Sequence, residues 1–397
     1  MKKILFNGIA CITFMLLLQK ASAFADSIPS TKTYRVGVFA PLYLDSVFSE
    51  TGNFRYREGM PKLMTSALDF VSGVQVALDS MRGINDRIEL TVYDTKSFKK
   101  PLASLISNSK LNQLDLLIGS VKDSDYKQLA DLALVKNIPF ISATYPNDGG
   151  ISKNPFVIVV NSTLKAHCEA IYSFLLQNHG TDKIFLCRKK GQQEDKVAAY
   201  FRLINEQDGR SLLNIQTLNF DSSISANFLK TKLDSNRQSV IIGASLDESF
   251  ALNLATACNT LKDQYPLTLI GMPNWDAFKS LTKKGSLENF PIYFTSPYFN
   301  TKADSSSRQL LDVYTQKTKG KPSDVAFKGF EVARIFVKLL TLYPNDFMSH
   351  LNEKSLKVFS DYNFRPVMKK GSNVPDYFEN KHLYFIKILN GSVVRAW

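Results

Sequence analysis

The sequence predicts an α/β protein built from two Rossmann-like lobes, each with a parallel β-sheet between layers of helices. Short runs of β-branched and aliphatic residues alternate along the chain with longer stretches in which apolar residues recur every three or four positions. That alternation is typical of parallel strands joined by right-handed helical crossovers. The runs are apolar almost throughout, as expected for strands covered on both faces. The chain has 397 residues, more than one hydrophobic core usually serves, so two lobes are expected.

The first 25 residues have the pattern of a secretory signal peptide. Two lysines precede a mostly apolar run over residues 4–18, and residues 21–25 contain two small-x-small cleavage sites. The alternative, a membrane anchor, needs about 20 apolar residues, and Gln19 and Lys20 end this run sooner. We therefore expect export to the periplasm or cell envelope.

A lipid anchor is not predicted. Residues 8–11 resemble a bacterial lipobox, but only residues 4–7 would form the apolar segment before it, and the apolar run continues beyond Cys11. A signal sequence needs about 7 to 15 residues in that segment.

Charge and cysteine content narrow the possible partners. Removal of residues 1–25 lowers the net charge from +13 to +10, which favours anionic partners. The basic residues are scattered, however, and no nucleic-acid motif occurs, so no nucleic-acid partner is expected. Cys168, Cys187 and Cys258 would remain, none at metal-ligand spacing. We expect buried thiols, no metal and no cofactor. The spacing leaves undecided whether Cys168 and Cys187 form a disulfide.

The elements follow one another in a regular order. The first strand is expected at 34–40, where Pro41 ends it, and a helix follows over 63–81, where apolar residues share one face. The remaining elements of the first half are strands at 88–93, 114–118, 138–142 and 156–160 and helices at 102–112 and 124–136. In the second half we expect helices at 164–178 and 194–207 and strands at 183–187, 214–218, 239–242, 267–270 and 292–295.

Small and polar residues follow several of these strands. Ligands of such sheets bind beyond the carboxyl ends of the strands, where the connecting loops gather. The loops of interest include residues 119–120, 142–144 and 243–245. Amides at the start of a following helix could receive a carboxylate there, whereas the alternative is ordinary helix capping by Ser or Thr. Their position after successive strands favours a binding site.

Six segments, by their order and spacing, carry a family resemblance. They are residues 34–41, 69–79, 117–120, 138–144, 154–156 and 322–331. Over most of residues 33–397 the chain resembles the type I periplasmic binding proteins, specifically the leucine/isoleucine/valine-binding family that serves branched-chain amino acid ABC transporters.

This resemblance implies two lobes joined by three crossing strands and closing on a ligand like a hinge. It places residues 33–160 and 297–349 in the first lobe and residues 161–296 and 350–397 in the second. The crossings would then lie near residues 160 and 295 and around residue 350.

The resemblance also implies a ligand site. In amino-acid-binding relatives, two loops of the first lobe grip the α-carboxylate and the amine. The matching residues here are Ser120, Val121, Ser142, Ala143 and Thr144, with Tyr43 as a possible wall. The second lobe would contribute Gln192, Asp247 and Trp275 from its loops.

Departures from the family pattern leave the ligand class open. Residues 120–123 replace a serine-rich loop, and Gln192 with Gln193 stand where a tyrosine commonly caps the ligand. Lys122 either stands near the carboxylate site or points into solvent. Asp247 or Asp276 either meets an amine or caps the following helix. The long segment 48–64 is either a lid or a disordered insertion.

Two functional hypotheses follow, and a third class, an envelope enzyme, would require a tight Ser/His or carboxylate pair inside the cleft. No catalytic motif occurs, and the four histidines (His167, His179, His350 and His382) fall outside the pocket loops, so no enzyme activity is expected. The first hypothesis is an exported solute-binding protein for a small polar molecule, such as an amino acid or peptide. It would serve a membrane permease or a sensor protein, as a monomer or weak dimer. The second is an envelope interaction module without a small-molecule ligand, which a cleft filled by Trp275 or Lys122 would favour.

Overall fold

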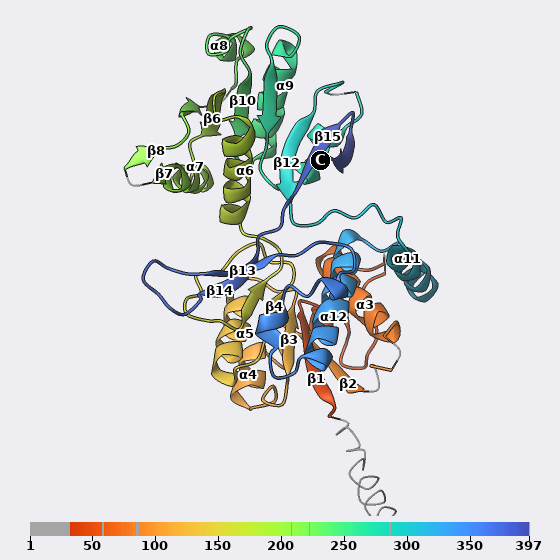
Figure 1. Ribbon diagram of the computed structural model, residues 1–397. Helices are drawn as coiled ribbons and strands as arrows, with labels where there is room; N and C mark the ends of the chain where they lie inside the picture. Colours follow the sequence, from red (N-terminus) through yellow and green to blue (C-terminus); the bar gives the residue numbers. More distant parts are fainter. Residues whose placement is uncertain are drawn as a thin grey trace, which may run out of the picture.

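Two lobes stacked end to end form the molecule (Figure 1). The structure is a computed structural model that describes residues 32–396 apart from 58, 82, 85, 86, 208, 222 and 286. The predicted signal peptide, residues 1–25, lies outside the described residues. Within the described part, no helix combines the length and apolar character needed to cross a bilayer.

The first lobe contains a seven-stranded sheet. Its consecutive parallel strands are β1 (Tyr34–Ala40), β2 (Ile88–Asp94), β3 (Leu116–Gly119), β4 (Phe140–Ser142) and β5 (Val157–Val159), in the spatial order β5-β4-β3-β1-β2. β14 (Tyr377–Asn380) pairs in parallel with β5, and β13 (Phe364–Val367) pairs antiparallel with β14.

Helices cover both faces of this sheet. On one face lie α3 (Lys62–Asp79), α11 (Ser305–Thr318) and α12 (Asp324–Leu342), and on the other α4 (Leu102–Ser107) and α5 (Asp123–Lys136). Successive strand residues serve opposite cores: Ile118 packs against the α3–α12 side and Leu117 against the α4–α5 side. Both faces are buried, which explains why the strands read as continuous apolar runs.

The second lobe repeats the plan. Its parallel strands are β6 (Lys183–Lys189), β9 (Ile215–Phe220), β10 (Ser239–Gly243), β11 (Leu267–Ile270) and β12 (Ile292–Ser296), in the spatial order β12-β11-β10-β6-β9. β15 (Tyr384–Leu389) pairs antiparallel with β12, and β16 (Ser392–Arg395) with β15. The main helices are α6 (Leu164–Asn178), α7 (Gln192–Asn205) and α9 (Glu248–Leu261). Two shorter helices are α8 (Ala226–Lys230) and α10 (Lys279–Thr282). A small separate hairpin consists of β7 (Glu206–Gln207) and β8 (Arg210–Ser211).

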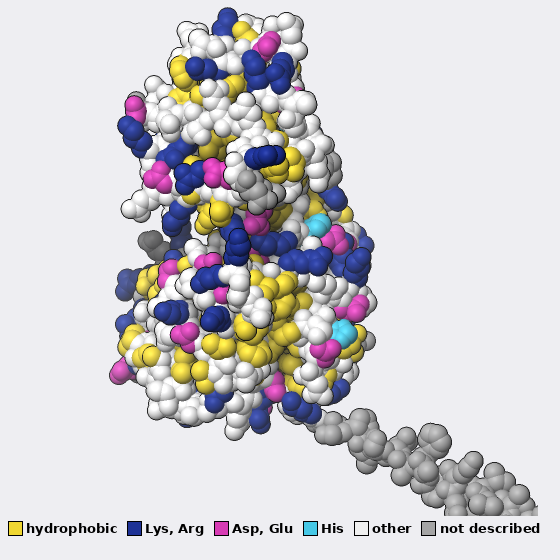
Figure 2. All heavy atoms as spheres, turned by 60° about the vertical axis from the view of Figure 1, so that its left-hand side comes forward, with side chains coloured by type: hydrophobic (Ala, Val, Ile, Leu, Met, Phe, Trp, Pro, Cys, Tyr) yellow, Lys and Arg dark blue, Asp and Glu magenta, His cyan; other side chains and the backbone are white. Residues whose placement is uncertain are grey.

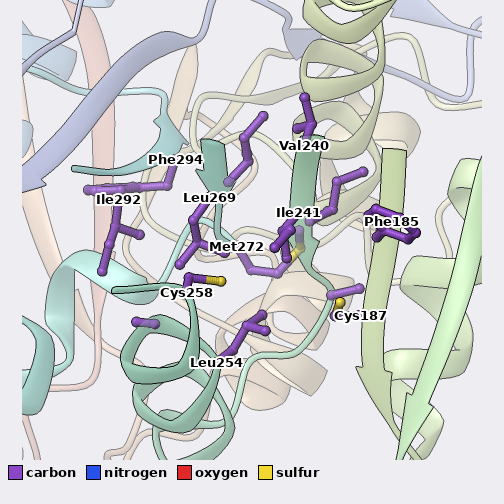
Figure 3. Packing of buried hydrophobic residues seen from close by; sticks show 14 of the residues in the cluster. Phe185, Cys187, Val240, Ile241, Leu254, Cys258, Leu269, Met272, Ile292 and Phe294 are labelled. Atoms are coloured by element: carbon purple, nitrogen blue, oxygen red, sulfur yellow. The ribbon is translucent and has the colours of Figure 1, made fainter. Parts of the chain in front are cut away.

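The three described cysteines lie in the core of the second lobe and are free thiols. Cys187 and Cys258 stand among side chains such as Ile241, Leu254 and Met272 (Figure 3). Burial raises the pKa of each of these thiols, including Cys168. The prediction of buried thiols is confirmed.

The C-terminal residues divide between the lobes differently from the expectation. β13 and β14 belong to the first sheet, and β15 and β16 belong to the second. The third crossing therefore falls between Asn380 and Tyr384, not around residue 350. Leu356 and Phe364 already pack into the first lobe's core, and β14 hydrogen-bonds to β5, which holds residues 350–380 with the first lobe.

The segment 48–64, expected as a lid or a disordered insertion, begins with a tight turn. Phe48 and Phe54 form an isolated antiparallel bridge with ring centroids 5.7 Å apart. The amide of Arg55 donates to the carbonyl of Val47 over 3.0 Å. Glu50 reaches Lys99, 3.7 Å away, in the loop after β2. These contacts all lie within the first lobe.

Candidate functional site

A cavity of about 600 Å³ lies between the lobes, at the carboxyl ends of both sheets. Its first wall comes from the loop after β4 and the start of α12, and its second wall from loops after β10 and β11. The crossing segments close it: Asn161 and Ser162 follow β5, and Ser296, Pro297 and Tyr298 follow or end β12. Lys and Arg side chains gather along the waist between the lobes (Figure 2). The volume is in the usual range of about 300–1,000 Å³ for small-molecule sites.

Of the loop residues expected to grip a carboxylate, Thr144 lines the cavity. Ser120 stands directly behind it, with the two side-chain oxygens 3.0 Å apart. Val121, Ser142 and Ala143 are buried in the first lobe and do not line the cavity. The Oγ of Ser142 has no hydrogen-bond partner among the described residues. The cradle expected from the resemblance therefore reaches the cavity through one of its five residues.

Tyr43 lies away from the cavity wall. Its backbone is left-handed, with φ 55°, at the start of the short helix α2 (Leu44–Val47). Asp94 fixes this turn, because its carboxylate accepts hydrogen bonds from the amides of Leu42, Tyr43 and Leu44 at 2.7–3.1 Å.

Gln192 and Asp247 also lie outside the cavity lining. Gln192 begins α7 and is exposed, whereas its neighbour Gln193 lines the cavity. Asp247 caps α9 by accepting from the amide of Phe250 at 2.8 Å, and it pairs with Lys189 at 3.0 Å. The hydrogen bond from the Phe250 amide and that from Lys189 hold the pKa of Asp247 below its usual value. Helix capping, the alternative left open by the sequence, is the role that Asp247 has here.

Trp275 belongs to the core of the second lobe and not to the cleft wall. It is fully buried, and its indole N–H donates to the carbonyl of Ser245 at 2.9 Å. Gly243 and Gly271 make room for it: a Cβ on either glycine would stand 2.3 Å from the indole ring. This position corrects the expectation that Trp275 faces a ligand.

The next residue, Asp276, does line the cavity. Its carboxylate is open to the cavity, yet surrounding protein atoms desolvate it and raise its pKa. The sequence offered Asp276 only as an alternative to Asp247. Trp275 and Asp276 both sit in the short 3-10 helix Trp275–Ala277: the first is buried in the core and the second lines the cavity.

Sequence reasoning missed two charged residues of the cavity, Asp324 on the first turn of α12 and, on its second turn, Lys328. Lys328 is half-buried, and desolvation lowers its pKa. Its neighbours Phe327 and Gly329 are buried, so a lysine stands within an apolar stretch of helix. That pattern, in a segment that otherwise carries only the family resemblance, was the signal from which Lys328 could have been predicted.

His167 also lines the cavity, which corrects the expectation that every histidine lies apart from it. It sits on the first turn of α6, and its Nδ1 is 2.7 Å from the Oγ1 of Thr295. Burial lowers the pKa of His167 to about 3, so the ring is neutral at physiological pH. Among the described residues no group of three His, Cys, Asp or Glu side chains is arranged to hold a metal ion.

The periplasmic binding protein family matches residues 61–353 of the sequence, about three quarters of the chain. The chain is a periplasmic binding protein. The predicted family and the predicted two-lobed fold are thus confirmed. No curated protein matches the sequence.

Solved structures with the same fold cover nearly the whole chain of this periplasmic binding protein. A putative branched-chain amino acid ABC transporter protein from Rhodospirillum rubrum has a TM-score of 0.64 at 11% identity, covering 91% of this chain and 99% of that one. An ABC transporter substrate-binding protein from Desulfitobacterium hafniense in complex with Leu has a TM-score of 0.52 at 13% identity, covering 92% and 100%. The isoleucine complex of LivJ from Streptococcus pneumoniae has a TM-score of 0.50 at 16% identity, covering 91% and 98%. At these identities the likeness concerns the fold.

In this periplasmic binding protein, buried polar contacts tie the crossing segments together beside the cavity. Glu379, at the end of β14, accepts from the amide of Thr163 at 2.8 Å and pairs with Lys381 at 2.6 Å. Lys381 also pairs with Glu169 of α6 at 2.8 Å. Ser162 donates to the carbonyl of Asn380 at 2.6 Å. The first and third crossings are therefore joined to each other by hydrogen bonds and ion pairs.

Proposed function

We propose that this periplasmic binding protein is exported and closes its lobes on a small polar ligand, such as an amino acid or peptide-like molecule. The closed form would then engage a membrane permease or a sensor protein. One observation carries the proposal: the cavity beside the crossings is lined by polar side chains from both lobes. A ligand that contacts both walls favours closure, because it gains contacts in the closed state that the open state lacks.

The side chains that line the cavity favour ligand binding over an interaction module without a small-molecule ligand. Trp275, which was expected to fill the cleft in that alternative, is buried in the core of the second lobe. Lys122 is exposed and does not line the cavity. The remaining lining offers hydrogen-bonding groups such as Asn147, Asn161 and Asn274, as a polar ligand requires.

Export is part of the proposal and rests on residues 1–25. Their positive start, apolar run and small-residue cleavage sites match a secretory signal. N-terminal sequencing of the protein recovered from the periplasm should show a chain that begins after residue 23 or residue 25. A chain retained in the cytoplasm with Met1 intact would contradict export.

Ligand binding is tested by a thermal-shift screen followed by small-angle scattering. The screen covers amino acids, dipeptides, organic acids, amines and sugars. A ligand at 100 times its dissociation constant should stabilise the protein by about 2.7 kcal/mol, and the radius of gyration should fall on binding.

A matched pair of variants locates the binding site. Gln193→Trp fills part of the cavity and should weaken binding at least tenfold, whereas Gln192→Trp, one residue away but outside the lining, should not. Equal binding by both variants would place the ligand elsewhere. No hit in any chemical class would reject the proposed function.

A further inference from the structure

Lys328 is the one lysine or arginine among the described residues that line the cavity. It is half-buried on α12, between the buried residues Phe327 and Gly329. Within the described part of the chain, its amine has neither a hydrogen bond nor a carboxylate oxygen within 4.0 Å. Desolvation lowers the pKa of Lys328 more than the surrounding carboxylates raise it. Such an amine is present as the neutral, nucleophilic base for a larger fraction of the time than an exposed lysine is.

The acidic residues of α12 on either side of Lys328 have other partners. Glu331 follows one turn later, and its two oxygens accept four hydrogen bonds from residues 359–362. Asp324 precedes Lys328 by one turn and lines the cavity, and it pairs with Lys302 at 2.9 Å. Neither carboxylate holds the Lys328 amine in an ion pair, so the amine is available to a molecule in the cavity.

Asp276 contributes a carboxyl group from the other lobe to the same cavity. In the described ranges it has no ion pair and no hydrogen bond to a side chain, and its hydrogen-bond donors are amides of its own turn, at Asp276 and Ala277. Desolvation and the charge of Asp324 raise the pKa of Asp276, whereas the charge of Lys328 lowers it. A carboxyl group with a raised pKa holds a proton more readily, so it can deliver that proton to an oxygen atom that leaves a bound molecule.

Both groups are carried by closely packed parts of the fold. Lys328 precedes Gly329, whose missing side chain lets α12 touch α3 in the core of the first lobe. Asp276 follows Trp275, whose ring is buried and whose indole N–H donates to the carbonyl of Ser245. The amine and the carboxyl group therefore reach the same cavity from backbone positions that are fixed, one in each lobe.

We propose that Lys328 binds aldehydes and ketones covalently and reversibly, as an imine. The neutral amine attacks the carbonyl carbon, a C–N bond forms, and the electron pair of the C=O bond moves to the oxygen. A proton passes from the nitrogen to the oxygen, which gives a carbinolamine. The C–O bond then breaks, the oxygen takes a proton from the Asp276 carboxyl group and leaves as water, and the nitrogen electron pair forms the C=N bond. The resulting iminium is balanced by the Asp276 carboxylate, no oxidant or reductant takes part, and water reverses the sequence.

This inference rests on the proposed ligand-binding function and names a ligand class, small carbonyl compounds. The cavity has room for such a molecule beside Lys328, since its volume is about 600 Å³. Apolar residues of the lining, Leu164, Leu246 and Val325, limit the access of water to a bound ligand. Limited access of water favours the imine, because hydrolysis is the reaction that returns it to the free amine and the carbonyl compound.

Reductive trapping tests the proposal on the wild-type protein. Sodium cyanoborohydride converts an imine into a stable secondary amine, and mass spectrometry of the digested protein reads each lysine separately. The probes are 3-methylbutanal, an aldehyde, and pyruvate, a 2-oxo acid, each at pH 7. Lys321 is the internal control, because it is exposed, lies shortly before α12 and is outside the lining. With at least one probe, the adduct on Lys328 should form at least about tenfold faster than the adduct on Lys321.

Two variants test the roles of Lys328 and Asp276. Lys328→Arg keeps a cation at this position but forms no imine with the probes, so the adduct at residue 328 should disappear while labelling of Lys321 stays within about twofold. Asp276→Asn should slow the formation of the Lys328 adduct at least about fivefold, because an amide does not act as an acid. The melting temperatures of both variants, compared with that of the wild type, show whether the fold is intact.

The outcomes separate this inference from the proposed function. Labelling of Lys328 that is no faster than that of Lys321 with either probe would overturn the inference. Hits from the ligand screen that lack a carbonyl group would then leave the solute-binding function intact. Fast labelling of Lys328 together with a screen without any hit would support the reactive amine and reject the proposed function. Slow labelling together with a screen without any hit would overturn both.

Discussion

Gly73 of α3 lies so close to Ala326 of α12 that a Cβ on Gly73 would stand 2.0 Å from the Ala326 carbonyl oxygen. The contact is reciprocal, since a Cβ on Gly329 of α12 would stand 2.2 Å from the carbonyl oxygen of Phe70 in α3. The two helices lie side by side in Figure 1. Two glycines thus allow the backbones to touch and set the position of the helix that carries Lys328.

Gly73→Ala and Gly329→Ala should each lower the free energy of unfolding by about 1–3 kcal/mol or more, because the added methyl forces backbone apart in a packed core. Urea denaturation measures the loss. Gly180→Ala is the matched control: Gly180 is exposed, and the nearest atom to its added Cβ is 3.5 Å away. Its effect should stay within about 0.5 kcal/mol. Equal stability of all three variants would show that the helices do not meet in this way.

Removing the buried carboxylate of Glu331 should leave donors at Phe359, Ser360 and Tyr362 without an acceptor. Glu331→Ala is expected to lower the free energy of unfolding by at least about 2 kcal/mol, since each buried donor that is left without an acceptor costs about 1–3 kcal/mol. Glu331→Gln keeps an oxygen for the two amides and should lose less than half as much. Urea unfolding of the two variants at pH 7 compares them, and a larger loss in Glu331→Gln would contradict the hydrogen-bond arrangement.

His167 should make the fold sensitive to mild acid. Burial lowers the pKa of His167 in the folded protein to about 3, below the ordinary histidine value of 6.5, so between these pH values the unfolded chain binds the proton more tightly. This contribution is fully present above pH 6.5 and declines as the pH falls. Between pH 6.5 and pH 5 the loss should be about 2 kcal/mol.

The measurement for His167 is a comparison of unfolding free energies in urea over that pH interval. His167→Gln lacks the titrating ring and should lose about 2 kcal/mol less than the wild type over the same interval. Other groups titrate in both proteins, so the difference between them isolates His167. Parallel pH profiles would rule out a buried, neutral ring at this position.

The contacts that join the first and third crossings should depend on Lys381. Lys381→Met leaves the buried Glu379 carboxylate without its cation and should cost about 2–4 kcal/mol, scaled down from a fully buried pair because Lys381 is partly exposed. Adding Glu379→Gln to Lys381→Met should recover part of that loss. A double-mutant cycle by thermal unfolding gives the coupling energy, and additive effects would show that the two groups act independently.

The strands of both sheets that alternate with helices were predictable from the sequence, because a strand buried on both faces reads as an apolar run. None of the four C-terminal strands, β13 to β16, was proposed. In β13 and β14, Arg365, Pro366, Glu379 and Asn380 interrupt the apolar pattern. Periodicity also does not say which sheet a short edge strand joins. The third crossing was misplaced for that reason.

The location of the site was easier to predict than its side chains. The loops at the carboxyl ends of the strands do surround the cavity, but neighbouring residues in one loop point in opposite directions. Trp275 and Asp276 illustrate this: one is buried in the core and the other faces the cleft. Ser142 and Thr144 differ in the same way. Such differences depend on local backbone geometry, which residue type and spacing do not specify.

The division of the C-terminal segment between the sheets has a consequence for how the chain folds. β14 covers the edge of β5 and β15 covers the edge of β12, so both sheets acquire these strands from residues 377–389. During synthesis, each half-finished sheet keeps an open edge until almost the whole chain has left the ribosome, and open edges invite pairing with other chains. Truncation before residue 364 would expose both edges at once. The two lobes are therefore expected to complete their folding together, in one late step, and not as independent units.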